Sequence, residues 1–357
     1  MWKIVDGWIH RYFADEEAVL LLMMMGGALL VIFTMGEVLA PFMAALVFSF
    51  LLQGLVSTLR GWRIPPLLAV SLVFSAFISV FLIFIVVLVP IVIEQTGLLL
   101  REVPGMLKHW QEMVLLLPER YPGVISEARL GELITYVRRE SAEFVETVLG
   151  VSMGVFPSVM VVMVYLVLVP LLVFFMLKDR EQLIDGVVGL LPERRPVMIK
   201  VWNEMNIQIA NYIRGKAVEV MLVGVVTYIS FFLLGVNYAA LLALMVGLSV
   251  VIPYIGAAVV TVPVVLVGLF QWGWASDFFW LFFAYSIIQF LDGNVLVPLL
   301  FSEAVNLHPI IIILAVLVFG GLWGLWGVFF AIPLATLVKA LYNAWPRSEI
   351  PVASESV

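Results

Sequence analysis

An acidic side chain lies inside an apolar stretch of this chain, where an isolated charge is costly. Asp292 is the only charged residue of the run 278–301, with Gln289 three positions before it and Asn294 two positions after it. Ionisable residues at such places are paired, protonated or hydrated, and they commonly mark ion or proton pathways. We therefore interpret Asp292 as a group that binds a cation or carries a proton. The alternative is a structural carboxylate that caps an interrupted helix.

Other polar side chains extend this candidate pathway. Glu219 begins an apolar run, and it either takes part in the pathway or is an interfacial acid paired with Arg214 or Lys216. Tyr254 lies beside a proline in a second apolar run, where it lines the pathway or fills a packing position. His308 precedes a proline, and capping of a helix start is the alternative to a transport role there.

The same residues argue against catalysis. The chain has no Cys, and its three histidines, His10, His109 and His308, are not spaced as a His-Glu-x-x-His zinc motif. Neither a Gly-x-Ser-x-Gly elbow nor a phosphate-binding loop of the Walker type is present. Asp277 and Asp292 do not lie in the sequence contexts of membrane aspartyl proteases. We expect no enzyme activity, no cofactor and no metal site.

Composition indicates where these residues reside. Of 357 residues, 64% are apolar and 12% are charged, whereas soluble domains carry about 25% charged residues. A soluble core would not bury so much apolar surface, but a lipid bilayer would cover it. The net charge of −6 gives no sign of nucleic-acid binding. We predict an all-α, polytopic integral membrane protein with about eight membrane segments.

Apolar runs and polar inserts alternate along the chain. Runs of about 18 or more apolar residues are candidates for transmembrane helices. The predicted parts are N-terminal membrane helices (1–93), a polar helical insert (94–150), a membrane helix (151–177), a second polar insert (178–216), a membrane transport core (217–341) and a tail (342–357). The inserts are expected to contain amphipathic helices over 127–150 and 197–216 because apolar residues recur there at three- to four-residue steps.

The transport core is expected to contain interrupted helices. Residues 217–338 hold no Lys or Arg, and the apolar segments 239–272 and 309–341 are too long for single spans. We interpret both as broken or re-entrant helical hairpins, because irregular backbone is tolerated at membrane depth only inside protein or beside a water-filled cavity. Interrupted segments of this kind point to a transport site. The residues expected at the helix breaks are Pro253, Gly256, Gly293, Pro298, Gly320, Gly321 and Gly324.

Basic residues predict the orientation in the membrane. With the N-terminus inside, the inner segments contain 13 Lys and Arg residues and the outer segment 94–150 contains six. Cytoplasmic loops carry such an excess of positive charge. We therefore expect a multi-pass protein of a bacterial inner membrane with both termini in the cytoplasm, in contact with the lipid bilayer.

Several motifs together resemble a known family. They are 251–257 (Val-Ile-Pro-Tyr-Ile-Gly-Ala), 289–298 (Gln-Phe-Leu-Asp-Gly-Asn-Val-Leu-Val-Pro), 306–309 (Asn-Leu-His-Pro) and the Gly- and Trp-rich run 319–333. Along essentially its whole length the chain is similar to the autoinducer-2 exporter family of bacterial inner-membrane permeases. The resemblance implies a permease, with autoinducer-2 export or sodium/proton exchange claimed for different members, and a homo-oligomer. Ala257 departs from the family pattern, in which many members have Pro.

Three functions follow as hypotheses. The first is export of a small polar solute similar to autoinducer-2, driven by its own gradient or by protons. The second is a sodium (or lithium)/proton antiporter, in which Asp292 binds the monovalent cation or proton directly. The third is a membrane scaffold without transport, which would tolerate removal of the charge at Asp292.

Overall fold

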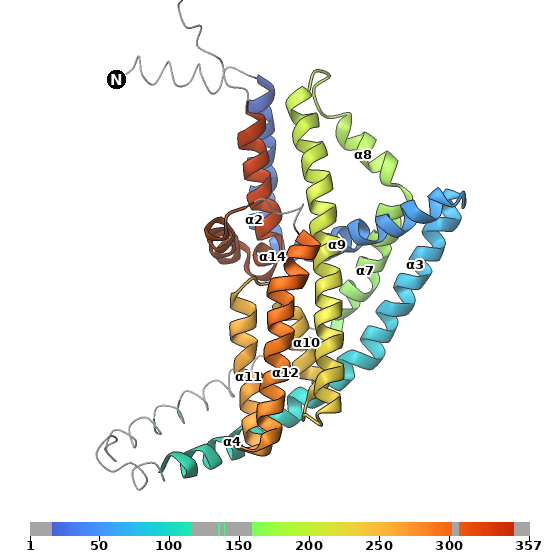
Figure 1. Cartoon of the computed structure of the whole chain (residues 1–357). Helices are drawn as coiled ribbons and strands as arrows, with labels where there is room; N and C mark the ends of the chain where they lie inside the picture. Colours follow the sequence, from blue (N-terminus) through green and yellow to red (C-terminus); the bar gives the residue numbers. More distant parts are fainter. Residues whose placement is uncertain (1–15, 116–134, 136–138, 140–158, 302–306, 346–357) are drawn as a thin grey trace, which may run out of the picture.

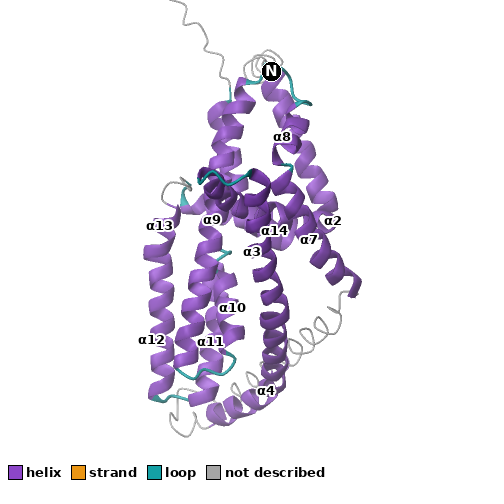
Figure 2. Cartoon of the chain, turned by 90° about the vertical axis from the view of Figure 1, so that its right-hand side faces the viewer, coloured by secondary structure: helices purple, strands orange, loops and turns teal. Residues whose placement is uncertain are grey.

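The computed structural model describes residues 16–115, 135, 139, 159–301 and 307–345 (Figure 1). Throughout these ranges the secondary structure is helical, with no strand (Figure 2), which confirms the predicted all-α fold. The elements are α2 (Glu16–Gly61), α3 (Pro66–Ile83), the π-helix η1 (Phe84–Leu88), α4 (Val89–Leu115), α7 (Val159–Lys178), α8 (Arg180–Val188), α9 (Pro196–Leu233), α10 (Ala239–Ser249), α11 (Ile255–Trp272), α12 (Ser276–Leu291), the π-helix η2 (Asp292–Leu296), α13 (Val297–Phe301) and α14 (Pro309–Ala344).

The helices have the length and surface of membrane spans. Seven helical stretches of the described ranges are long and apolar enough to cross a bilayer. Large apolar side chains such as Val86, Leu299 and Leu325 are about 70% exposed. Exposed apolar surface on this scale is unfavourable in water and is covered by lipid in a membrane protein. The chain is thus a polytopic membrane protein, as its composition predicts.

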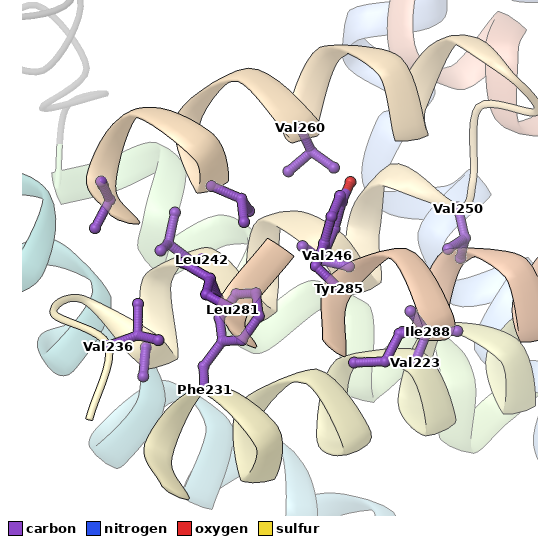
Figure 3. Packing of buried hydrophobic residues seen from close by; sticks show 13 residues of the cluster. Val223, Phe231, Val236, Leu242, Val246, Val250, Val260, Leu281, Tyr285 and Ile288 are labelled. Carbon is purple, nitrogen blue, oxygen red and sulfur yellow. The ribbon is translucent and has the colours of Figure 1, made fainter. Parts of the chain in front are cut away.

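The transport core packs around α9, α10, α11 and α12. Figure 3 shows their shared apolar cluster, in which Phe231 of α9, Leu242 and Val246 of α10, and Leu281 of α12 are almost fully buried. In a bilayer such helices are held together by close packing rather than by removal of apolar surface from water. Gly224 and Gly247 meet where α9 crosses α10, and a side chain on Gly247 would press on the backbone of α9.

Two first-turn amides of these helices are satisfied by distant side chains. A helix leaves its first N–H groups without partners inside the helix. The amide of Met198, in the first turn of α9, donates to Glu17 Oε1 of α2 at 2.7 Å. The amide of Leu241, in the first turn of α10, donates to Gln95 Oε1 of α4 at 2.8 Å. These bonds fix α2 against α9 and α4 against α10.

Segments that the sequence assigns to one side of the membrane lie together. The start of α2, the start of α9 and the end of α14 share a small apolar cluster that includes Leu21, Val201 and Ala340 (upper part of Figure 1). Arg60, after the second predicted span, lies 3.6 Å from Glu181 at the start of α8. The base of the α10–α11 hairpin contacts α4 at the other end. Which end faces the cytoplasm stays a prediction.

Two predicted boundaries fall inside continuous helices. α9 passes through Lys216, the predicted limit between the insert 178–216 and the transport core, and α4 passes through the predicted limit at residue 93. At 38 residues, α9 is about 57 Å long, so part of it extends beyond an apolar layer of about 30 Å. The predicted amphipathic helix over 197–216 is the first half of α9, whereas that over 127–150 and most of the tail 342–357 lie outside the described residues.

Both predicted hairpins are present. α10 ends at Ser249, α11 begins at Ile255, and the two helices pack against each other. α14 leaves helical geometry at Gly324, where φ is 58° and ψ is −136°, a region that only glycine adopts without strain. Ala315 packs in one apolar cluster with Ala331 and Ala335, so the two arms of α14 fold back on each other. In a straight helix, residues 315 and 331 would lie about 24 Å apart.

Candidate functional site

Three charged side chains are buried together at the centre of the transport core. Lys216 and Glu219 of α9 are 5% and 1% exposed, and Asp292 of η2 is 9% exposed. The Lys216 ammonium donates to Glu219 Oε2 at 2.7 Å. Asp292 interacts electrostatically with both Lys216 and Glu219. Because charges are almost never buried without partners, this arrangement is a functional candidate.

The tip of the α10–α11 hairpin supplies a second partner for the ammonium. The Lys216 Nζ donates to the backbone carbonyl of Val250 at 2.6 Å. Val250 follows directly on the end of α10, where the last carbonyls of a helix have no partner within it. Lys216 therefore ties α9 to the interruption between α10 and α11. Ile252, two residues after Val250, packs on the apolar cluster of the α14 hairpin.

Aromatic side chains form the walls around this charge cluster. The Lys216 ammonium lies 5.2 Å from the centre of the Phe301 ring, within the range of a cation–π interaction. Gly215 makes room for that ring, since a Cβ on it would lie 2.7 Å from the nearest ring atom. Tyr212, 2% exposed, donates its hydroxyl to the carbonyl of Phe329 at 3.1 Å. These contacts bring α13 and α14 against α9 and keep the charges away from lipid.

Asp292 is the incompletely satisfied member of the cluster. Its Oδ1 atom is buried and has no hydrogen-bond partner within the described residues. Asp292 begins a π-helical turn, and such turns occur frequently at functional sites. With Lys216 and Glu219 ionised and paired, a deprotonated Asp292 would leave one negative charge uncompensated. A proton or one monovalent cation would balance it.

The predicted polar neighbours of Asp292 do not converge on it. Gln289 donates instead to the Tyr285 hydroxyl at 3.1 Å. Asn294 is exposed and donates to the carbonyl of Phe290, one turn earlier in its own helix. Asn294, two residues after Asp292, faces a different side of the helix, and Gln289, three residues before it, bonds to Tyr285. Neither side chain is a hydrogen-bond partner of Asp292 in this structure, and their place in the transport pathway stays a prediction.

Glu219 forms an ion pair and His308 caps a helix start, which are the structural alternatives to a transport role for these two residues. Tyr254 lies at the surface. Glu219 pairs with Lys216 rather than with Arg214. His308 Nδ1 accepts from the Ile310 amide at 3.3 Å at the start of α14. Tyr254 is 62% exposed and has a positive φ of 63° directly before α11.

Glycines and prolines expected at helix breaks fall into two groups. Gly256 lies at the α10–α11 interruption, after Pro253, and a Cβ on it would overlap the Ser249 carbonyl. Gly324 is the turning point of α14, whereas Gly320 and Gly321 are helical. The remaining two, Gly293 and Pro298, lie within the continuous helical path from α12 through η2 to α13. Asp292 therefore stands in a widened helical turn and not at the broken helix end that its sequence suggested.

Lys216 is the buried charged residue of this cluster that is not among the sequence-predicted site residues. Two signals mark it: it is the last basic residue before the Lys- and Arg-free tract, and it stands three positions before Glu219. Residues three apart face the same side of a helix. The described residues contain no group of three His, Cys, Asp or Glu side chains that would suit a metal ion.

A polar cavity of about 610 Å³ lies away from this cluster, at the base of the α10–α11 hairpin. Its lining includes Arg101 and Glu102 of α4 together with Tyr238 and Gln271. Burial, followed by the hydrogen bond and charge of Glu102, raises the pKa of Tyr238 to about 12. Tyr238 thus lies beside Glu102 of α4, where the base of the α10–α11 hairpin meets that helix.

The fold is that of a polytopic helical membrane protein with charged residues buried between its helices. Residues 19–347 match the family model described as AI-2E family transporter, and the chain belongs to this family. It is 45% identical to PerM of Escherichia coli K12 over 350 residues, covering 98% of this chain and 99% of PerM. It is 26% identical to YueF of Bacillus subtilis, with 84% of each chain covered. It is 24% identical to the AI-2 transport protein TqsA of Escherichia coli K12, with 85% of each covered.

Proposed function

We propose that this permease exports a small polar solute in exchange for a proton that binds at Asp292. The observation that carries the proposal is the buried Asp292 carboxylate, which lies beside the Lys216–Glu219 ion pair and whose Oδ1 atom lacks a hydrogen-bond partner among the described residues. A transport role also accords with the relative named as an AI-2 transport protein. The solute class is therefore a small polar molecule similar to autoinducer-2.

Charge balance supplies a coupling mechanism. With Asp292 protonated, the cluster contains one ammonium and one carboxylate and has no net charge. With Asp292 ionised, it carries one negative charge, which is strongly unfavourable in a low-dielectric interior. Gain or loss of the proton at Asp292 therefore changes the charge that the surrounding core must accommodate, and this change couples proton binding to rearrangement of the core. The two hairpins next to the cluster are the elements that would rearrange, since interrupted helices surround the binding sites of many transporters.

A sodium (or lithium)/proton antiporter is the second candidate. It is favoured by the single unsatisfied oxygen of Asp292, because a proton and a monovalent cation would compete for the same carboxylate. No organic solute is required for that exchange. A membrane scaffold is the third function considered, and it gives no reason for three buried charges.

Transport measurements distinguish these functions. Purified protein is reconstituted into liposomes with a pH-sensitive dye inside and an imposed pH gradient. Efflux of autoinducer-2 that accelerates with the inward proton gradient supports the first proposal. Proton movement on addition of sodium or lithium alone identifies the antiporter. The absence of both responses from protein that is folded by size-exclusion chromatography would contradict coupled transport.

We further propose a bacterial inner-membrane location, cytoplasmic termini and a homo-oligomer. The basic residues near α2, α8 and the start of α9 support this orientation. Ile199, Trp202 and Ile207 support the oligomer, because they are more than half exposed on the first half of α9, which belongs to the predicted insert outside the membrane. Native mass spectrometry from mild detergent tests the assembly, and a monomer in every detergent and nanodisc would contradict it.

A further inference from the structure

We infer that Lys216 is a movable internal cation, which shifts toward Asp292 when that residue is ionised and thereby releases the tip of the α10–α11 hairpin. The inference rests on the proposed function, in that Asp292 takes up and gives off the coupled proton. It assigns Lys216 as a positioning residue that converts the charge at Asp292 into a movement of the hairpin.

The contacts of the ammonium set up this exchange. A lysine ammonium has three donors, and in this structure Lys216 directs two of them to Glu219 and to the Val250 carbonyl. Asp292 is the second acid that interacts electrostatically with Lys216, and its Oδ1 still lacks a hydrogen bond. Lys216 thus has one charged partner, one neutral partner and one nearby acid that it does not bond.

The two existing bonds differ in strength, which decides which of them is lost. A hydrogen bond between an ammonium and a carboxylate is roughly twice as strong as one between neutral groups, and only Glu219 offers the ammonium a charged acceptor. When Asp292 becomes ionised, it attracts Lys216 through a low-dielectric interior. The bond to the uncharged Val250 carbonyl is therefore the one that gives way.

Loss of that bond acts directly on the hairpin. The Val250 carbonyl lies just past the end of α10, where no intrahelical partner is available, so it must find a new donor. Two residues on, Ile252 packs on the α14 hairpin cluster, which includes Ala315 and Ala331. A displacement of the tip would thus be transmitted to the α14 hairpin through this existing contact.

Within the part of the chain that the structure describes, few titratable groups surround Lys216. On its own helix these are Glu219 and Tyr212, the latter interacting electrostatically with Glu219. From η2 it is Asp292. The contacts from α13 and α14 are aromatic or apolar, through Phe301 and other members of the same cluster. Asp292 is the group among these whose change of charge is proposed to move the ammonium.

Single-cysteine labelling tests this inference, because the chain has no native Cys. Ala258→Cys places a thiol at an exposed position in the first turn of α11, beside the hairpin tip. Ser276→Cys, exposed at the start of α12, is the reference thiol. A thiol reacts as its thiolate, so alkylation of any cysteine becomes faster as the pH rises. The quantity measured is therefore the alkylation rate at position 258 divided by the rate at position 276. We expect this ratio to rise about fivefold in one step as Asp292 ionises, which is the factor that corresponds to loss of a hydrogen bond worth roughly 1 kcal/mol at the tip.

Variants show whether Lys216 causes the step. Asp292→Asn should keep the ratio low at all pH values, because Lys216 then stays on Val250. Lys216→Met combined with Glu219→Gln removes both charges of the pair and should give a high, pH-independent ratio. The double change avoids leaving Glu219 buried and unpaired, which would threaten folding. Lys200→Met, on an exposed position of the same helix, should keep the step.

The outcomes separate this inference from the proposed function. If the folded double variant keeps the pH step while Asp292→Asn abolishes proton-coupled flux, Lys216 is not the movable cation and the proposed function stands. If Asp292→Asn keeps both the step and the flux, the proposed function fails as well. Failure of the double variant to fold moves the test to Lys216→Arg, which keeps the charge. There, an unchanged step midpoint would contradict the inference, and a shifted midpoint would support it.

Discussion

Substitution of Gly256 tests whether the close backbone contact at the hairpin tip holds the transport core together. In Gly256→Ala, the new methyl group would overlap the backbone carbonyl of Ser249, and no rotamer change can move either the Cβ or that carbonyl. Overpacking of this kind costs typically about 1–3 kcal/mol. The tip must open, and the packing of α10 on α11 weakens with it.

A matched glycine makes the expected effect specific. Gly321 also lies in a helix, but a Cβ on it would meet nothing within 4 Å. Gly321→Ala should therefore be neutral or stabilising by up to about 1 kcal/mol, the ordinary helix preference of alanine over glycine. The two Gly→Ala changes are predicted to have opposite signs, although their chemistry is identical.

Intrinsic tryptophan fluorescence follows thermal unfolding of both variants in detergent, since the chain contains 11 Trp residues. The account predicts a lower midpoint and lower folded yield for Gly256→Ala and an unchanged or higher midpoint for Gly321→Ala. Equal midpoints for the two variants would refute the close contact at residues 249–256.

Three other predictions concern the ion pair, the orientation and a helix start. Lys216→Met alone leaves Glu219 buried without its partner and should destabilise the protein by about 3–5 kcal/mol, seen as loss of folded yield, and adding Glu219→Gln should restore most of that yield. Cysteines at the exposed positions Gly186 and Ser276 should react with a membrane-impermeant reagent from the cytoplasmic and the outer side respectively, and the reverse pattern would overturn the orientation. Gln95→Leu removes the acceptor of a first-turn amide of α10 and should lower stability by about 1 kcal/mol, whereas an unchanged thermal midpoint would show that the bond contributes nothing.

The sequence predicts the helical membrane fold well because its signals are local. Apolar runs of span length, Pro residues at the first positions of α3, α9 and α14, and glycines at the turning points are all read from short windows. The two hairpins follow from segments too long for one span with a breaking motif in the middle. The predicted limits at 93 and 216 are not visible as helix ends, because a change from apolar to polar residues can end a membrane span without ending a helix, and they stay predictions.

The site is predicted less completely because it depends on contacts distant in sequence. Lys216 and the Val250 carbonyl are 34 residues apart, and no spacing rule joins them. Gln289 and Asn294 lie close to Asp292 in sequence, yet each hydrogen-bonds to another group of its own helix. Their own hydrogen bonds, to Tyr285 and to the backbone, are visible only in three dimensions.

Proton-coupled flux through Asp292→Asn tests the central claim most directly. The variant is compared in liposomes with the parent and with Asp277→Asn, which removes a carboxylate from an exposed position in the first turn of α12. Initial efflux of autoinducer-2 and the dye response are recorded with and without an imposed pH gradient. The account predicts that Asp292→Asn folds with normal yield and no longer responds to the gradient, while Asp277→Asn behaves like the parent. A normal response of folded Asp292→Asn to the pH gradient would contradict the account.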